Sequence, residues 1–242
     1  MKKPSLECCL TPSLSELTDF KNKNVVVIDV FRATSTISAI LNNGADAVIP
    51  VKDLEDCKKI SGENILYAAE RNGQKPPGFE FGNSPFDYPE NIVNGKTVVL
   101  TTTNGTKAVE ISKKNAKNII TGSFTNFSTV VKWLSNNKSD TILFCAGWKG
   151  QFSLEDTLFA GAVAEKLQTD FILEGDSITG AKSMYTEAKK VGLLDYAKQA
   201  AHFKRLQHLG IQRDMEHCLT FDIYNVLPIY TDGKLIASET GF

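Results

Sequence analysis

Residues 25–28, a run of three Val and one Ile, limit the fold more than any other stretch, because apolar, mostly β-branched residues predict a buried strand. Residues 37–44 then predict a helix that ends at Gly44. Asp29 and Arg32 therefore fall where a strand gives way to a helix, and ligands bind at that edge of open α/β sheets. A carboxylate and a guanidinium placed there can hold a metal ion and an anionic group.

The layout of strand, polar loop, helix and strand occurs three times, in residues 25–51, 97–121 and 141–173. It predicts largely parallel strands joined by right-handed crossovers. Residues 181–209 favour helices, and Asp232-Gly233 between two apolar runs predicts a hairpin. We therefore expect a three-layer αβα protein with mixed, largely parallel sheets. No linker interrupts residues 1–242, so we expect one structural unit, open to a division into two lobes.

The charge balance argues against broad binding to nucleic acid or anionic membranes, because 27 basic and 28 acidic residues leave a net charge of -1. The N-terminal lysines precede no apolar core of a signal peptide, and no apolar run approaches membrane-spanning length. Five cysteines without a C-x-x-C pair indicate reduced thiols in a cytoplasmic protein and no zinc site. A homodimer is expected only from the frequency of symmetric dimers.

Two acid–arginine pairs follow predicted strands. Asp29 can be a Mg²⁺ ligand or a nucleophile beside Arg32, which suits phosphate oxygens. The alternative is a helix-capping Asp29 with a local ion pair. Glu70 and Arg71 follow the strand predicted at residues 65–69 and can supply a second metal ligand and a second cation; the alternative is a surface ion pair of little energetic weight.

Residues 101–106, Thr-Thr-Thr-Asn-Gly-Thr, can cradle an anion at a helix start, although they lack the Gly-Lys-Ser/Thr ending of a P-loop. An ordinary N-cap is the alternative. Residues 70–85 are dense in Gly and Pro and predict an irregular loop that forms a wall of the site. Within this loop, Asn83-Ser84 can also be a simple Asx-type turn.

Ser153 and Asp156 allow two interpretations, a near capping box or a metal ligand at Asp156 aimed from a helix start, with Glu155 exposed in both. Cys145 does not fit a cysteine phosphatase, because Gln151 stands where the required Arg would be. It is expected to be a buried small residue. His202, His208 and His217 lie outside the three loops, which favours solvated or capping roles.

Taken together, the chain resembles the 2-phosphosulfolactate phosphatase family. The matching segments lie between about residues 25 and 161 and are 29–36, 44–45, 70–71, 78–85, 102–106, 145–147 and 155–156. One departure is Glu70-Arg71-Asn72-Gly73, where the family pattern is closer to Gly-Glu-Arg-Gly-Gly. The resemblance implies two mixed-sheet lobes. It also implies Mg²⁺-dependent removal of phosphate from 2-phospho-3-sulfolactate, a step toward coenzyme M.

Such a substrate is a small phosphorylated, sulfonated 2-hydroxy acid, and it needs a metal, cations and many neutral donors. The expected metal ligands are Asp29, Glu70 and Asp156, and the expected catalytic groups are Asp29 and Arg32. The expected substrate-binding residues are Thr34, Ser35, Arg71, Asn83, Ser84, Thr102, Thr103, Asn104, Gly105 and Lys149. Water and Asp29 remain alternatives for the nucleophile.

Two other functions compete with this hypothesis. A haloacid-dehalogenase-like phosphatase needs Asp-x-Asp after the first strand, but Phe31 stands in place of the second Asp. A non-catalytic binder of small phosphorylated acids would use the same anion cradle without a metal. Metal-dependent turnover distinguishes the enzyme from the binder.

Overall fold

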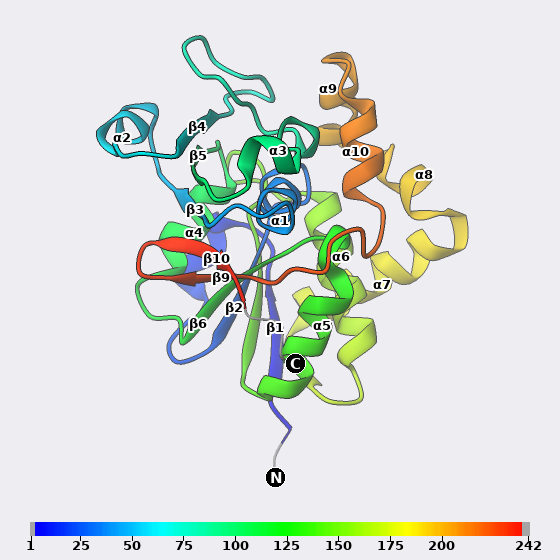
Figure 1. The fold of residues 1–242 in the computed structure, drawn as a ribbon. Coiled ribbons are helices and arrows are strands. Elements are labelled where there is room, and N and C mark those ends of the chain that lie inside the picture. The colour runs from blue at the N-terminus through cyan, green and yellow to red at the C-terminus, as the bar shows by residue number, and fades with distance from the viewer. Residues whose placement is uncertain (1–2, 239–242) are drawn as a thin grey trace.

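The computed structural model describes residues 3–238, and its strands form one sheet of ten in the order β4-β5-β3-β10-β9-β6-β2-β7-β1-β8 (Figure 1). The strands are β1 (Ser5–Cys9), β2 (Asn24–Ile28), β3 (Ala47–Pro50), β4 (Ile65–Ala69), β5 (Thr97–Thr101), β6 (Asn118–Gly122), β7 (Thr141–Cys145), β8 (Ile172–Leu173), β9 (Pro228–Thr231) and β10 (Lys234–Ala237). The helices are α1 (Ala33–Asn42), α2 (Leu54–Lys59), α3 (Glu90–Val93), α4 (Gly105–Ser112), α5 (Phe127–Asn137), α6 (Leu154–Leu167), α7 (Asp176–Val191), α8 (Leu193–Ala197), α9 (Ala201–His208) and α10 (Gln212–Cys218). Short 3₁₀ helices are η1 (Pro12–Leu17), η2 (Pro85–Asp87) and η3 (Phe124–Asn126).

The sheet consists of two parallel blocks joined by an antiparallel hairpin. The small block contains β4, β5 and β3, and the large block contains β6, β2, β7, β1 and β8. The hairpin of β9 and β10 lies between them, and pairs antiparallel with β3 and with β6. Three successive antiparallel pairings separate β3 from β6, so the two blocks run in opposite senses.

The hairpin confirms the turn predicted at Asp232-Gly233, where both residues have positive φ angles, of 46° and 86°. The prediction that the first two strand–helix–strand units each join parallel strands is wrong. β2 and β3 belong to different blocks, as do β5 and β6, so α1 and α4 each connect strands of opposite sense. The reason is tertiary, because a hairpin from the end of the chain is inserted between the blocks.

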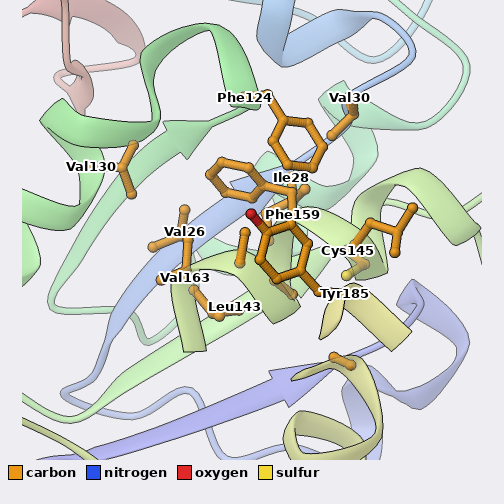
Figure 2. Packing of buried hydrophobic residues seen from close by; sticks show 14 of the residues in the cluster. Val26, Ile28, Val30, Phe124, Val130, Leu143, Cys145, Phe159, Val163 and Tyr185 are labelled. Atoms are coloured by element: carbon orange, nitrogen blue, oxygen red, sulfur yellow. The ribbon is translucent and has the colours of Figure 1, made fainter. Parts of the chain in front are cut away.

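Helices cover both faces of the large block, as a buried central strand requires. Every residue of β2 is buried, and its side chains alternate between the faces. Val26 and Ile28 pack with Phe124 and Phe159 under α5, α6 and α7 (Figure 2). On the other face, Val25 and Val27 belong to a cluster with residues of α4.

The small block is also covered on two faces. Ile37 and Ile40 of α1 cluster with Val48 and Val98, whereas Cys57 of α2 clusters with Val99. Both blocks thus have the three-layer αβα arrangement expected from the sequence. No helix within residues 3–238 has the length and apolar character needed to cross a membrane.

The predicted helical tail is confirmed as α7 to α10. In Figure 1, α9 and α10 lie on the side of the molecule away from α2 and β4. The tail is anchored by buried apolar residues, among them Phe203, Leu206 and Met215, which join the core of the large block. This anchoring brings α9 to the edge of the sheet where the strands end.

Candidate active site

A pocket lies between the two blocks, and residues that follow strands of each block line it. Asp29 follows β2 and Trp148 follows β7 in the large block, whereas Glu70 follows β4 and Asn104 follows β5 in the small block. The complete lining is Asp29, Phe31, Arg32, Glu70, Gly73, Asn83, Thr103, Asn104, Trp148, His202, Arg205 and Leu206. The structure therefore brings Asp29, Glu70 and Asn104 into one cavity.

Asp29 is a buried carboxylate with an altered proton affinity. Its Oδ1 accepts a long hydrogen bond of 3.4 Å from the backbone N–H of Ala33, so it caps α1 only weakly. Burial raises the pKa of Asp29 to about 7, while attraction by His202 opposes the rise and repulsion by Glu70 adds to it. At neutral pH this group is poised between its acid and its base form.

Gly105 explains how α4 can start so close to Asp29. A Cβ at position 105 would lie 2.8 Å from Asp29 Oδ2 and 2.7 Å from the Cβ of Ala33. Both distances are too short for any side chain, so the position requires Gly. The first turns of α1 and α4 thus converge on Asp29, and their N-terminal dipoles favour negative charge there.

Glu70 organises the loops of the small block instead of forming a surface ion pair. It is 8% exposed, and its Oε1 accepts hydrogen bonds from the backbone N–H of Gly73 at 2.5 Å and from Thr103 Oγ1 at 3.3 Å. Its Oε2 accepts a bond from the backbone N–H of Thr103 at 3.2 Å. The loop after β4 and the loop after β5 are therefore held together by one carboxylate.

Arg32 does not pair with Asp29, contrary to the local ion pair weighed from the sequence. Its guanidinium forms a buried ion pair with Asp214 of α10 and donates a second hydrogen bond, of 2.8 Å, to the carbonyl of Gly73. The Phe31–Arg32 peptide bond is cis. Arg32 lines the pocket while tying three segments together, and its catalytic role stays a prediction.

Asp156 is buried and accepts two backbone hydrogen bonds. Its Oδ1 binds the N–H of Val30 at 2.8 Å and its Oδ2 binds the N–H of Gly147 at 3.1 Å. Burial raises its pKa well above the usual range, and the charge of Glu155 adds to the rise. Ser153 is the N-cap of α6 but makes no capping hydrogen bond through its side chain, so the capping box is wrong. Asp156 is not part of the pocket lining, and its role as a metal ligand stays a prediction.

Of the predicted substrate-binding residues, Asn83, Thr103 and Asn104 line the pocket. Thr34 and Ser35 instead hold the loop of Asp29, because Thr34 Oγ1 donates to the Asp29 carbonyl at 2.8 Å and Ser35 Oγ donates to a neighbouring carbonyl at 3.0 Å. Their direct contact with a ligand stays a prediction.

The remaining predicted binders lie just outside the lining. Arg71 donates to the Glu70 carbonyl at 2.7 Å and lines a separate groove together with Thr102. The backbone N–H of Lys149 donates to Asn104 Oδ1 at 3.1 Å, which joins the loops after β5 and β7. Ser84 Oγ accepts a bond of 3.3 Å from the N–H of Phe86, whereas Asn83 forms no Asx turn, because Pro85 has no N–H and Asn83 Oδ1 has no hydrogen-bond partner within residues 3–238.

Sequence reasoning missed the part of the site that α9 supplies. His202 and Arg205 both line the pocket, so the solvated or capping role favoured for His202 is wrong. Glu155 was expected to be exposed but is 1% exposed, and it forms a hydrogen bond of 2.6 Å with His202 Nδ1. Burial raises the pKa of Glu155, but the charge and hydrogen bond of His202 outweigh it and leave the pKa below its usual value.

A signal for α9 was present but ambiguous. His202 and Arg205 are three residues apart and so share a helix face, beside the buried Phe203 and Leu206. Many surface helices show this pattern. Nothing along the chain indicates that this helix packs against the carboxyl edge of a sheet formed far earlier in the sequence.

The oxygen donors of the pocket suit a hard divalent cation. Asp29 and Glu70 contribute carboxylates, and Asn83 Oδ1 is buried with no hydrogen-bond partner within residues 3–238. No cluster of three or more His, Cys, Asp or Glu suited to a metal occurs in this described part of the chain. Mg²⁺ typically takes one or two carboxylates, several waters and substrate phosphate oxygens, so the set present fits this ion.

Comparison with known proteins adds an independent finding. The family model described as 2-phosphosulpholactate phosphatase matches residues 9–233, a range that contains every residue of the pocket. Probable 2-phosphosulfolactate phosphatases of Thermotoga petrophila and Thermotoga maritima are each 44% identical over 217 residues, which are 90% of this chain and 93% of each relative. The protein of the same description from Caldanaerobacter subterraneus subsp. tengcongensis is 40% identical over 225 residues, 91% of this chain and 93% of the relative.

Proposed function

Since this chain belongs to the 2-phosphosulfolactate phosphatase family, we propose that it is a phosphoric monoester hydrolase that converts 2-phospho-3-sulfolactate to 3-sulfolactate and phosphate. The observation that carries the proposal is the buried Asp29 in a pocket lined also by Glu70, within the matched range. A raised carboxyl pKa beside a second acid is typical of functional sites.

The charge of the pocket supports a requirement for a divalent cation. The lining contains two acids, Asp29 and Glu70, and two arginines, Arg32 and Arg205, one of which is already paired with Asp214. The proposed substrate brings a carboxylate, a sulfonate and a phosphate of roughly two negative charges at neutral pH. The residues alone cannot neutralise it, so we propose that Mg²⁺ is held by Asp29 and Glu70, with Asn83 as an additional oxygen donor.

The chain's own residues can position each participant of the reaction. When bound, Mg²⁺ would withdraw charge from the phosphoryl oxygens. Asp29 either orients the attacking water or attacks phosphorus itself, and the N-terminal turns of α1 and α4 favour the negative charge that develops. His202, held at Nδ1 by Glu155, can use its other ring nitrogen to give a proton to the departing ester oxygen.

The competing functions fit the structure less well. In a haloacid-dehalogenase-like phosphatase a second acid would replace Phe31, but this side chain packs against the rings of His202 and Phe203 at centroid distances of 5.9 and 6.1 Å. A metal-free binder gives no reason for two buried acids in a pocket meant for an anion.

Phosphate release with and without Mg²⁺ tests the proposal. We expect metal-dependent turnover of 2-phospho-3-sulfolactate, slower turnover of phospholactate, and loss of both in Asp29→Asn. Binding of the substrate without turnover would instead support a binder. Trapping of a beryllofluoride adduct on Asp29 would identify this residue, and not water, as the nucleophile.

Two further expectations from the sequence belong to the same proposal. The proposed cytoplasmic location is supported by five cysteines that are all free and buried, whereas the proposed homodimer rests only on the frequency of symmetric dimers. Light scattering at several protein concentrations tests the dimer, and fractionation of cells tests the location.

A further inference from the structure

Arg205 is the arginine of the pocket that has no hydrogen bond or ion pair within the described residues. Its Nε is buried and has no hydrogen-bond partner within residues 3–238, and its Cζ lies 3.8 Å from the ring centre of Trp148. Arg32, by contrast, is bound to Asp214 and to the Gly73 carbonyl. Two guanidinium groups thus line one pocket, but within residues 3–238 only Arg205 has neither an ion pair nor a hydrogen bond.

Both sides of the Arg205–Trp148 stack are held in place. The backbone of Trp148 exchanges hydrogen bonds with Gln151, at 3.0 and 2.9 Å, across a tight turn. On the other side, α9 is fixed by the bond between His202 and Glu155 and by the buried Phe203. The close contact with the indole ring therefore limits the positions that the guanidinium can take before any ligand arrives.

An unpaired, partly buried cation destabilises the folded protein unless a ligand pairs with it. Burial lowers the pKa of Arg205, although Glu155 and Glu70 oppose the change, so this side chain lies in an environment that disfavours its charge. No hydrogen bond to either acid accompanies that attraction. A planar fork of N–H donors in such a position matches an anion with paired oxygens.

We propose that Arg205, held against Trp148, binds the sulfonate of the substrate and so determines specificity. This inference depends on the function proposed above. In 2-phospho-3-sulfolactate the carboxylate and the phosphoryl oxygen are attached to the same carbon, so both would lie near a cation if Asp29 and Glu70 hold one as proposed above. The sulfonate is attached to the next carbon and can reach a different wall of the pocket, which is where α9 presents Arg205.

The test compares two substrates that differ only in the sulfonate, 2-phospho-3-sulfolactate and phospholactate. For Arg205→Gln we expect KM for the sulfonated substrate to rise roughly 10- to 100-fold, the loss of one charge-assisted contact. KM for phospholactate should stay within about threefold. Arg205→Lys keeps the charge but not the planar set of donors, so its KM for the sulfonated substrate should lie between those of the wild type and Arg205→Gln. Melting temperatures of both variants check that the fold is intact.

Arg213→Gln is the matched control, because Arg213 also stacks on an aromatic ring, with its Cζ 3.9 Å from the ring centre of Phe86, but neither residue lines this pocket. It should change neither KM. Equal losses on both substrates in Arg205→Gln would overturn the assignment of the sulfonate, and unchanged kinetics would overturn any binding role. If the wild type releases no phosphate from either substrate, the proposed function fails, and calorimetry with 3-sulfolactate then tests Arg205 alone.

Discussion

The two walls of the pocket are built on different principles. The sheet-edge wall consists of the loops after β2, β4 and β5, and there Glu70 and Arg32 each hold other loops through hydrogen bonds inside the protein. The helical wall consists of the α9 residues His202, Arg205 and Leu206, and its guanidinium has no such bond within residues 3–238. Glu70 and Arg32 of the sheet-edge wall are thus bonded within the protein, whereas Arg205 of the helical wall keeps its donors for a ligand.

The largest expected effect is the loss of turnover when the carboxylate of Asp29 is removed. Asp29→Asn keeps the shape but removes the charge, and we expect kcat to fall roughly 10⁴-fold, as for other essential catalytic groups. The equally buried Asp156 accepts two backbone hydrogen bonds and serves as the comparison. If Asp156 only holds the backbone of Val30 and Gly147, Asp156→Asn should lower the melting temperature more than kcat. An equal loss of kcat at an unchanged melting temperature would instead support Asp156 as a metal ligand.

The next prediction concerns the ion pair that links Arg32 of the sheet-edge wall to Asp214 of α10. Asp214→Ala leaves the buried Arg32 without its partner, and the free energy of unfolding should fall by about 3–5 kcal/mol. Asp195→Ala breaks an exposed pair with Lys198 and should cost less than about 1 kcal/mol. Urea titrations of the two variants measure both values. Similar small losses would show that Arg32 does not need Asp214 to hold the loop after β2.

A smaller effect tests whether the helical wall contributes to the chemistry. His202→Gln should lower kcat about 10²-fold and abolish one limb of the pH–rate profile, because proton donation to the leaving oxygen is lost. His208→Gln, an exposed change on the same helix, should leave the profile unchanged. An unaltered profile in His202→Gln would confine α9 to binding.

The smallest effect is on stability and follows from the raised pKa of Asp29, about 7. A carboxyl whose pKa is higher in the folded than in the unfolded state is increasingly destabilising as the pH rises from about 4 to about 7. Asp29→Asn removes this ionisation, so its stability advantage over the wild type should grow by about 2.5 kcal/mol between about pH 5 and about pH 8. Denaturant titrations with a chelator present measure this, and a constant difference would contradict the raised pKa.

Added Mg²⁺ should stabilise the wild type relative to Asp29→Asn. If Asp29 is a ligand, the metal will raise the melting temperature of the wild type and have little effect on Asp29→Asn at about pH 8. The readout does not depend on turnover. An equal shift in both proteins would place the metal elsewhere.

The sequence by itself determined the elements and the sheet-edge wall. Residues 25–28 predicted a buried strand, and the polar residues after the predicted strands were expected at strand ends, because these signals are local. Pairing between distant segments is not local. Only the tertiary structure decided that the β9–β10 hairpin reverses one block against the other, and that α9 closes the pocket. The buried contacts of Phe203 and the bond of His202 to Glu155 join segments far apart along the chain, and no local pattern specifies such partners.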